Sequence, residues 1–412
     1  MHFALMCPPY AGHLNPMFAI AEALRGRGHH STFIGLADVS HRVTSAGFKH
    51  RTLGAVSHPR GSLQRMEGRL ARLNGLSGLR VAISDMAGIT DMLCFEGAAA
   101  LRALAPDGIV CDQLEPAGGL LARHLQLPCV SVANALMIDR EPYVPPPFTN
   151  WAYSRTGWGR SRNLGGYRVT DWLMGDVSRV ITQWSRRWRL QGLGTVDDCL
   201  AVLQVGQLSS ALDFPRESLS SGFNYLGPFR SSSSKALWPK PSLSHCRLAY
   251  VSLGSLQGGR HELIANITQA CRDQGFTAVV AHGGRLSATQ AAALPGAPIV
   301  EDFVPQQAVI DRCDVVISHG GMNTVLDALA VGVPLVLVPL AMEQGAISQR
   351  VVRAGVGLQV RSRLPGVRAL RQAIDASLGS ARCKQRAASM AASLQAAGGA
   401  PRAAELIERH AR

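Results

Sequence analysis

Residues 318–344 read "SHGGMNTVLDALAVGVPLVLVPLAMEQ", and this stretch decides the fold of the 412-residue chain. An apolar run ends at His319 and two glycines follow. A helical run then begins near Met322, and a second apolar run, "VPLVLVPL", comes after it. Strand, glycine turn, helix and strand in this order predict a βαβ unit of a parallel sheet.

The same alternation extends outward through the second half of the chain. Strand-like runs are "RLAYVSLGS" and "FTAVVAHGG", and helix-like runs are "HELIANITQACRDQG" and "EQGAISQRVVRAG". The first half repeats the pattern with "HFALMC", "HSTFIGL", "DGIVCDQ" and "PCVSVA" as strands. Between them, "NPMFAIAEALRGRG" and "PAGGLLARHLQL" are expected to form helices. Two doubly wound, Rossmann-like α/β domains are therefore predicted.

The two halves are joined by "GPFRSSSSKALWPKPSLSHC", which is rich in Ser and Pro and has no regular pattern. We predict an N-terminal domain over residues 1–228, a linker over 229–247 and a C-terminal domain over 248–395. A final helix over 396–412 is expected to pack back on the N-terminal domain. Ligands bind beyond the carboxyl ends of strands in such sheets, so a cleft between the domains is the expected site.

Composition limits the classes of function. The chain has 42 basic and 28 acidic residues, a formal charge of +14 that would suit nucleic acid, an anionic membrane or a phosphorylated substrate. No zinc-finger spacing, RNP signature or basic zipper occurs, so we expect no nucleic-acid partner. The nine cysteines contain no CxxC pair, which favours reduced thiols in a cytoplasmic protein without a zinc site. The opening "MHFALMCPP" lacks a basic leader, and no run of about 18 apolar residues predicts a membrane span.

The two glycines before Met322 predict a diphosphate site. They let the backbone approach a ligand closely, and the helix start offers free N–H groups, without a metal. The alternative is a simple turn in which Asn323 or Thr324 caps the helix. Asp327, one turn farther along, and the pair Glu343-Gln344 after the next strand favour the ligand site. GxGxxG, GxxxxGK[ST] and GxSxG are all absent, which disfavours dinucleotide enzymes, P-loop proteins and serine hydrolases.

The stretch 319–344 resembles the donor signature of inverting, GT-B-fold glycosyltransferases that use UDP-sugars. "TDMLCFE", "VCDQLEPAGGLLA", "DREP", "DWLM", "LDFPRESL", "SLGSLQG" and "HGGMNTVLDAL" resemble, in order, the bacterial zeaxanthin glucosyltransferases of the family 1 glycosyltransferases. The likeness covers most of the chain and is weakest between residues 145 and 170.

The resemblance implies a catalytic pair. In "PPYAGHL", residues 8–14, His13 matches the family's general base, and Asp112 at the end of "GIVCD" matches the carboxylate that orients it. An imidazole whose pKa lies near neutral pH can take the proton of the acceptor hydroxyl as that hydroxyl attacks the sugar. The carboxylate would stabilise the imidazolium that forms. The alternatives are a solvated or capping role for His13 and an N-cap role for Asp112 in the helix that follows.

The resemblance also implies donor contacts from three residues before the glycine turn. Ser255 in "SLGS" matches a hydroxyl that meets the phosphates; its alternative is a turn serine. Phe303 and Gln306 in "FVPQ" match the uracil-stacking and nucleotide-contacting positions. Phe303 stands where plant relatives carry Trp, and its alternative is a core residue.

Within the signature, the phosphate loop would comprise His319, Gly321, Asn323 and Thr324. Asp327 stands where many relatives carry a Glu that grips the ribose hydroxyls, so its reach is one methylene shorter. The alternative for Asp327 is an exposed helix acid. Glu343-Gln344 replaces the commoner Asp-Gln that reads the sugar hydroxyls, which leaves the identity of the sugar open.

The implied reaction moves glucose from UDP-glucose, with inversion, to the ring hydroxyls of a hydroxylated carotenoid such as zeaxanthin. The product would be a β-glucoside or diglucoside. UDP-glucose is a co-substrate, and no cofactor or metal is expected. One alternative keeps this chemistry on another apolar acceptor, such as a macrolide, sterol, phenolic or lipid. Another is a UDP-sugar-binding protein without transfer activity.

The acceptor side has no specific motif. Residues 151–190 hold five of the six tryptophans and eight arginines, a mixture that suits a membrane interface. They equally fit an ordinary helical insert whose tryptophans face its own core. The preceding "EPYVPPPF" is either the lining of the acceptor mouth or a connector. A carotenoid acceptor would favour a cytoplasmic enzyme in peripheral contact with the inner face of the cell membrane.

Overall fold

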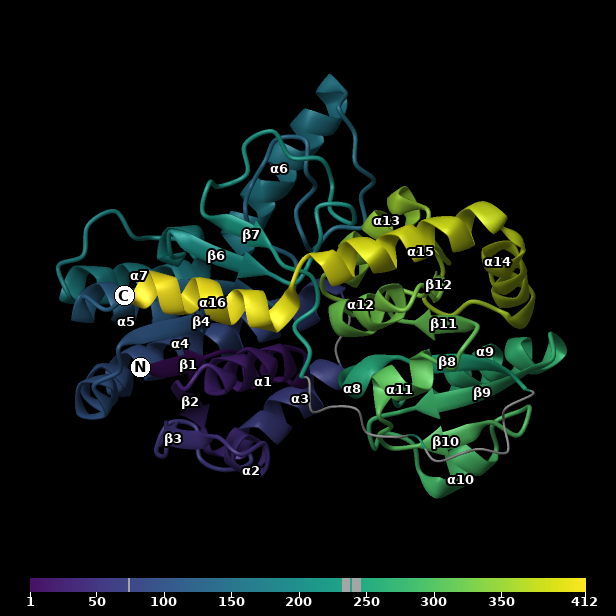
Figure 1. The fold of residues 1–412 in the computed structure, drawn as a ribbon, viewed down its shortest axis with the longest axis horizontal. Helices are drawn as coiled ribbons and strands as arrows, with labels where there is room; N and C mark the ends of the chain where they lie inside the picture. The colour runs from purple at the N-terminus through teal and green to yellow at the C-terminus, as the bar shows by residue number, and fades with distance from the viewer. Residues whose placement is uncertain (73–74, 232–237, 239–245) are drawn as a thin grey trace.

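The computed structural model describes residues 1–72, 75–231, 238 and 246–412. Two parallel sheets lie side by side, each covered by helices on both faces (Figure 1). The first sheet has the strand order β3-β2-β1-β4-β5-β6-β7, and the second has the order β10-β9-β8-β11-β12-β13. The predicted α/β class with two doubly wound sheets is confirmed.

The first sheet is built from seven strands in the first half of the chain. They are β1 (His2–Met6), β2 (His30–Leu36), β3 (Lys49–Leu53), β4 (Gly108–Asp112), β5 (Cys129–Ala133), β6 (Leu203–Gly206) and β7 (Phe223–Tyr225). The α-helices of this half are α1 (Ala11–Gly26), α2 (Ser40–Ser45), α3 (Ser62–Arg72), α4 (Gly75–Leu104), α5 (Pro116–Leu125), α6 (Gly157–Leu173) and α7 (Gly175–Arg187). Two short 3₁₀ turns, η1 (Ala37–Val39) and η2 (Asp197–Cys199), complete it.

The second sheet lies in the second half. Its strands are β8 (Arg247–Ser252), β9 (Phe276–Ala281), β10 (Ile299–Glu301), β11 (Val315–Ser318), β12 (Leu335–Leu337) and β13 (Gly357–Gln359). The helices are α8 (Gly254–Gln257), α9 (His261–Asp273), α10 (Ala288–Ala292), α11 (Gln306–Ile310), α12 (Met322–Ala330), α13 (Gln344–Ala354), α14 (Val367–Gly379), α15 (Ala381–Ala396) and α16 (Gly399–Ala411).

Strand β1 shows why the first sheet is covered on both faces. Successive side chains of a strand point to opposite faces. Phe3 and Leu5 join a buried cluster with α1 and α16, whereas Ala4 and Met6 join another with α4, α5 and α7. A strand buried on both faces reads as a continuous apolar run, as this one does.

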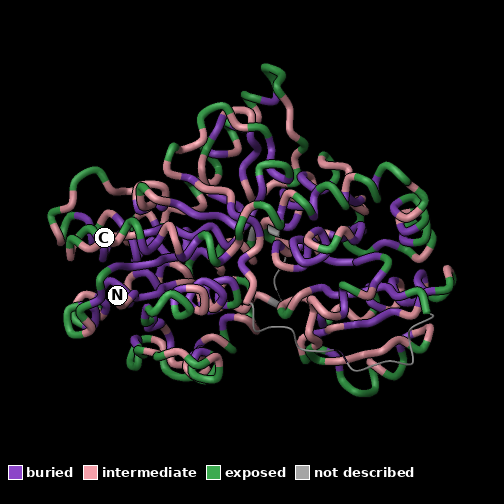
Figure 2. Tube along the Cα trace, in the orientation of Figure 1, coloured by how far each residue is buried: buried purple, intermediate pink, exposed green. Residues whose placement is uncertain are grey.

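Strand β8 has the same role in the second sheet. Leu248 and Tyr250 pack with α12 and α15, and Ala249 and Val251 pack with α9 and α14. Figure 2 shows buried backbone, in purple, along the strands of both halves, with exposed segments mostly at the edge of the molecule.

The last helix, α16, lies against α1 in the N-terminal half (Figure 1). Ala403 and Ile407 are buried there, and Arg27 donates from Nε to Glu408 Oε2 at 2.6 Å. The domain limits that we placed in the sequence stay a prediction. Most of the expected linker, 229–247, lies outside the described residues.

The two halves are in direct contact. Leu208 and Leu212, which follow β6, belong to the same buried cluster as α12 and α15. Beside them Arg350 of α13 donates from Nε to Asp213 Oδ1 at 2.7 Å, and both side chains are almost fully buried. The interface is therefore buried and closely packed, which holds the carboxyl ends of both sheets next to each other.

Candidate active site

His13 lies at the carboxyl end of β1, but within a helix. The sequence places it in the turn before a helix, whereas α1 already begins at Ala11 and His13 occupies its first turn. The N-cap position belongs to Tyr10, so a capping role for His13 is wrong. The His13 side chain keeps 18% of its surface exposed, so a small ligand atom can still reach it.

Asp112 holds the imidazole. It ends β4, which pairs with β1, and its Oδ2 lies 2.7 Å from His13 Nδ1. A carboxylate cannot donate, so Nδ1 carries the proton and the lone pair of the neutral ring is on Nε2. The N-cap alternative for Asp112 is wrong, because Glu115 caps α5 by accepting from the Ala117 amide.

Asp112 is itself fixed by two further donors. Its Oδ1 accepts from the Leu114 amide at 2.8 Å, and its Oδ2 also accepts from Asn134 Nδ2 at 2.7 Å. Asp112 and Asn134 are each only 2% exposed. Because both oxygens are held, the carboxylate has one orientation and so does the ring that it binds.

The charges around His13 favour its protonated form. Burial lowers the pKa of His13, but attraction to Asp112, the hydrogen bond with it and attraction to Glu343 together outweigh burial and raise the pKa. Next to Asp112, burial raises the pKa of Glu115 to about 8, so that carboxyl is mostly protonated at neutral pH. Glu115 therefore adds no full negative charge beside Asp112, and the second carboxylate that acts on His13 is Glu343.

The glycine turn lies opposite, at the carboxyl end of β11. Gly320 has a φ of 87°, and Gly321 is the N-cap of α12 with no side-chain capping bond, so the capping roles proposed for Asn323 and Thr324 are wrong. The first-turn amides of α12 consequently lack a side-chain cap, as an anion site requires.

His319 fills the space between two glycines. A Cβ on Gly254 would lie 2.8 Å from His319 Nε2, and a Cβ on Gly321 would lie 2.5 Å from it. Burial lowers the pKa of His319 to about 4, so the ring is neutral. Its Nδ1 lies 3.3 Å from the Ser252 carbonyl, to which it donates.

Asn323 joins the two turns. Its Nδ2 donates to the Gly12 carbonyl at 3.0 Å, and its Oδ1 accepts from Gln207 Nε2 at 3.2 Å. Gly12 immediately precedes His13, so the start of α12 and the start of α1 face each other in one site.

Known proteins match this chain over nearly its whole length. A zeaxanthin glucosyltransferase of Pantoea ananas is 37% identical over 418 residues, covering 99% of this chain and 95% of the relative. Another zeaxanthin glucosyltransferase, from Pseudescherichia vulneris, is 36% identical, covering 99% and 97%. This chain belongs to the glycosyltransferase family of these enzymes. Residues 277–410 also match the family "Erythromycin biosynthesis protein CIII-like, C-terminal domain".

Solved glycosyltransferases share the fold. A glycotransferase of kitacinnamycin aligns with a TM-score of 0.78 at 22% identity, over 99% of this chain and 98% of that one. The calicheamicin glycosyltransferase CalG4 aligns with a TM-score of 0.77 at 22% identity, over 99% and 97%. The glycosyltransferase VinC, solved in complex with dTDP, aligns with a TM-score of 0.69 at 17% identity, over 100% and 99%. The chain is thus a GT-B glycosyltransferase.

The glycosyltransferase's predicted nucleotide residues form one hydrogen-bonded group. Asp327 Oδ2 accepts from Gln306 Nε2 at 2.5 Å, and Thr324 Oγ1 donates to Gln306 Oε1 at 3.2 Å. Asp327 Oδ1 accepts from Arg230 Nε at 2.5 Å. Asp327 is only 8% exposed, so its alternative as an exposed helix acid is wrong. Both oxygens of Asp327 already accept hydrogen bonds, so a ribose hydroxyl would share the carboxylate with Arg230.

The other predicted donor contacts differ in their exposure. Phe303 is 76% exposed, so the core alternative is wrong and its ring is open to stacking. Ser255 is exposed in α8, where its carbonyl accepts from Arg285 Nε at 2.9 Å. Gln344 Oε1 accepts from the Leu340 and Ala341 amides, and these bonds stabilise the loop between β12 and α13.

Three functional candidates were missed in the sequence: Asn134, Gln207 and Arg230. Gln207 is fully buried; its Nε2 also donates to the Asn134 carbonyl, and its Oε1 accepts from Arg230 Nη1 at 3.2 Å. Hydrogen bonds therefore run from Asp327 through these three residues to Asp112. Asn134 and Gln207 each directly follow a strand, and that position was the available signal.

No group of three or more His, Cys, Asp or Glu side chains among the described residues could hold a metal ion. No helix in the described part of the chain is long and apolar enough to cross a bilayer.

Proposed function

We propose that the enzyme transfers glucose from UDP-glucose to the ring hydroxyls of a hydroxylated carotenoid such as zeaxanthin, giving a β-glucoside or diglucoside. The single observation that carries the proposal is the pair of zeaxanthin glucosyltransferases that match at 36% and 37% identity over nearly the whole chain. The facing of His13 and the start of α12 supports the chemistry.

In the proposed reaction, His13 Nε2 takes the proton of the acceptor hydroxyl. The hydroxyl oxygen forms a bond to the anomeric carbon from the face opposite UDP, and the bond from that carbon to the diphosphate oxygen breaks with its electron pair. The configuration inverts in this single displacement. Asp112 holds the ring and stabilises the imidazolium.

The negative charge of departing UDP would be met by the first-turn amides of α12. His319 would hold the glycine turn in place, because its neutral ring already donates its one N–H to the Ser252 carbonyl. Phe303 is proposed to stack on uracil, Gln306 to contact the nucleotide, and Asp327 the ribose. Ser255, Asn323 and Thr324 would contact phosphate. Glu343 and Gln344 would contact the sugar hydroxyls.

A small cavity in the N-terminal half suits an apolar group. It has a volume of about 20 Å³ and is lined largely by apolar side chains, among them Leu14, which follows His13 in the chain, Leu36, Ile89 and Leu93. That volume holds about one water, so a carotenoid ring could enter only if the lining moves. The segment 141–148 is proposed to line the acceptor mouth. Asn150, just beyond it, accepts from Gln349 of α13 at 3.0 Å.

The enzyme is further proposed to be cytoplasmic and to work in peripheral contact with the inner face of the cell membrane. All nine cysteines are free thiols, which supports a reducing compartment. A carotenoid resides in the bilayer, so its glucosylation requires access to lipid.

The test is incubation with UDP-glucose and zeaxanthin in detergent micelles, with products identified by mass and the anomeric configuration by NMR. A β-linked mono- or diglucoside is expected. Parallel incubations replace the acceptor by a macrolide, a sterol and a phenolic. Turnover of one of these without turnover of zeaxanthin would overturn the acceptor assignment. UDP binding without turnover of any acceptor would favour a non-catalytic binding protein.

A further inference from the structure

Helix α6 stands away from both sheets at the top of the view in Figure 1. Its inner face is fixed to the segment beneath it. Asn163 Nδ2 donates to the Pro142 carbonyl at 3.1 Å, and Tyr167 OH donates to the Val144 carbonyl at 3.0 Å. These bonds set the rotation of the helix, so the residues on its other side are held toward solvent.

That outer side is apolar and aromatic. Trp158 is 71% exposed, Trp172 is 65% exposed, and Val169 between them is 53% exposed. Trp172 lies 14 positions after Trp158, which places the two tryptophans about 21 Å apart along the helix axis and about 40° apart around it. Two such exposed rings on one stripe leave a large apolar area in water, which usually marks a contact surface.

Two other tryptophans of the segment behave differently. Trp184 is buried and donates from Nε1 to Asp91 Oδ1 at 2.7 Å, and Trp188 stacks on His124. These two pack into the core that α4, α5 and α7 share with the first sheet, and not into a separate core of an insert. Trp158 and Trp172 remain outside that core.

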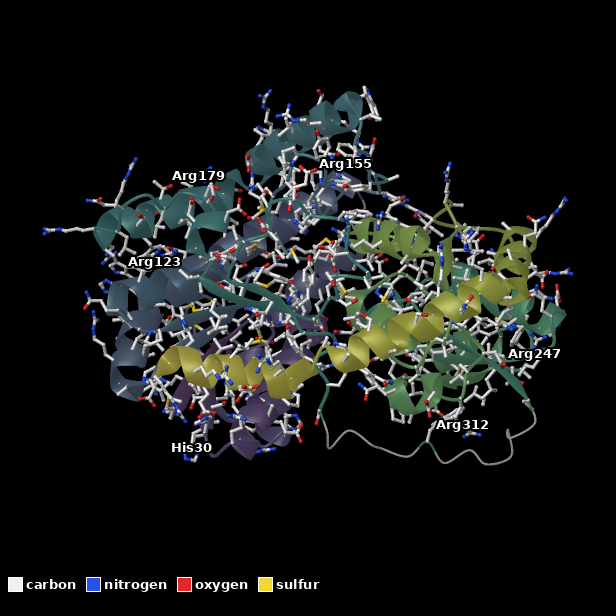
Figure 3. All side chains as sticks on the ribbon, turned by 45° about the horizontal axis from the view of Figure 1, so that its top comes forward. His30, Arg123, Arg155, Arg179, Arg247 and Arg312 are labelled. Carbon is white, nitrogen blue, oxygen red and sulfur yellow. The ribbon has the colours of Figure 1, made fainter. Side chains whose placement is uncertain are left out.

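Arginines surround the stripe. The Arg162 guanidinium lies 5.2 Å from the centre of the Trp158 ring, and that of Arg80 lies 5.0 Å from the centre of the Trp172 ring. Arg168, one turn before Trp172 on the same helix, and Arg80 are exposed. Figure 3 also labels Arg155, which precedes α6, and Arg179 of α7, but these two are paired with the carboxylates of Glu217 and Asp176.

The nearby acids are already neutralised. Asp171 accepts from Arg140 Nη1 at 2.7 Å, and Asp176 accepts from Arg179 Nη2 at 2.9 Å. The face therefore has an excess of positive charge. Two copies of this face would repel each other, whereas an anionic surface would be attracted.

We propose that the outer face of α6, defined by Trp158, Val169 and Trp172 with Arg168 and the adjacent Arg80, docks on an anionic phospholipid bilayer. This proposal deepens, and rests on, the proposed carotenoid acceptor and peripheral contact. The tryptophans enter the interface between headgroups and acyl chains, and the arginines bind lipid phosphates.

Docking on this face brings the proposed acceptor mouth to the lipid. The inner face of α6 lies on the segment that contains Pro142 and Val144, and that segment continues to Asn150 at α13. A carotenoid end ring leaving the bilayer beside α6 would meet the interdomain side of this segment first.

The experiment is vesicle flotation of the full-length enzyme. Vesicles contain either phosphatidylcholine alone or phosphatidylcholine with phosphatidylglycerol in equal amounts, at low and high salt. We expect binding to the anionic vesicles that weakens with salt. The double variant Trp158→Ser/Trp172→Ser and the double variant Arg80→Glu/Arg168→Glu should each bind at least tenfold more weakly. The matched control Val202→Ser/Leu364→Ser alters exposed apolar residues elsewhere and should bind like the unmodified enzyme.

Three results would overturn the proposal. The unmodified enzyme could fail to float with anionic vesicles at low salt. The variants of the α6 face could bind as well as the control. Light scattering could show a dimer that the tryptophan variant loses, which would assign the face to a second copy. Turnover of zeaxanthin in micelles, measured on the same proteins, separates this test from that of the proposed function. It should be unchanged in the variants of the α6 face even where flotation is lost.

Discussion

Two carboxylates raise the basicity of His13, and they come from different halves of the molecule. Asp112 contributes through contact at 2.7 Å, and Glu343, which precedes α13, contributes through charge alone. A base that must be neutral to act, and whose pKa is raised, loses activity as the pH falls through that raised value. At the residue scale the site therefore predicts a pH dependence as well as a loss on substitution.

Replacement His13→Ala should lower kcat by about 10²- to 10⁴-fold, the usual contribution of general base catalysis. UDP binding should be unchanged, because the proposed donor contacts come from the other half of the chain. Steady-state kinetics with calorimetric titration of UDP measure both effects. Turnover near that of the unmodified enzyme would show that another group takes the proton.

Replacement Asp112→Asn should shift the acid limb of kcat/KM to lower pH. The unmodified enzyme has a raised His13 pKa, and loss of the carboxylate removes the largest of the causes that raise it. The plateau rate should also fall, because the imidazolium is no longer stabilised. Glu343→Gln is the matched comparison and should shift the limb in the same direction by less. An acid limb that does not move in either variant would contradict the assignment of His13 as the titrating base.

At the scale of one element, α12 depends on Gly321, an N-cap residue that has no side chain to cap the helix. Gly321 has φ −66° and ψ 138°, values open to any residue, so its conformation does not require glycine. The close approach of His319 does, because a Cβ would lie 2.5 Å from its Nε2. The absence of a side chain at the start of α12 thus keeps both the ring and the amides in place for an anion.

Replacement Gly321→Ala should weaken UDP binding about tenfold, since displacing a packed ring typically costs 1–3 kcal/mol and about 1.4 kcal/mol corresponds to tenfold. Gly366→Ala is the matched control. Gly366 is also the N-cap glycine of a helix, α14, with similar φ and ψ, and a Cβ there would meet nothing within 4 Å. Its UDP affinity should be unchanged. Equal effects of the two substitutions, measured by titration calorimetry, would refute the role given to His319.

At the scale of the whole molecule, Gln207 connects the two halves. Its Nε2 donates to the Asn134 carbonyl and to Asn323 Oδ1, and its Oε1 accepts from Arg230 Nη1 and the Phe229 amide. All four hydrogen-bonding positions of this buried amide are occupied. Gln207 therefore links Asn323, at the start of α12, to the backbone of Asn134, whose side chain holds Asp112.

Replacement Gln207→Met should lower kcat/KM for UDP-glucose at least tenfold, because it removes four hydrogen bonds that average about 1 kcal/mol each and leaves buried partners unpaired. The control is Gln204→Met. Gln204 is 6% exposed, and its side chain accepts from Gln113 within the N-terminal half. We expect Gln204→Met to lower thermal stability but to keep kcat/KM within about twofold of the unmodified enzyme. If both variants lose activity in proportion to stability, Gln207 has only a structural role.

The βα alternation around β1, β4 and β5 and through most of the second sheet was predictable because those elements have their own local patterns. Strands β3, β6 and β7 and helices α3 and α4 were not predicted. Continuous apolar runs indicate strands buried on both faces, and the Gly-Gly turn before Met322 indicates a tight strand-to-helix connection. The start of α1 was placed too late, since Pro8 and Pro9 suggest a longer turn than the one that ends at Tyr10. Boundaries depend on a few backbone hydrogen bonds, to which periodicity is insensitive.

Periodicity and turn chemistry are local properties, so the amino-acid sequence specifies the two parallel sheets and the residue types at the ends of their strands. Which of those residues meet depends on how the chain folds as a whole. The bonds of Asn323 to Gly12 and of Arg230 to Asp327 join positions 311 and 97 residues apart, and no local pattern encodes such pairs. The burial of Asp327 and the exposure of Trp158 and Trp172 were decided at that level too, since burial depends on what the rest of the chain packs against each side chain.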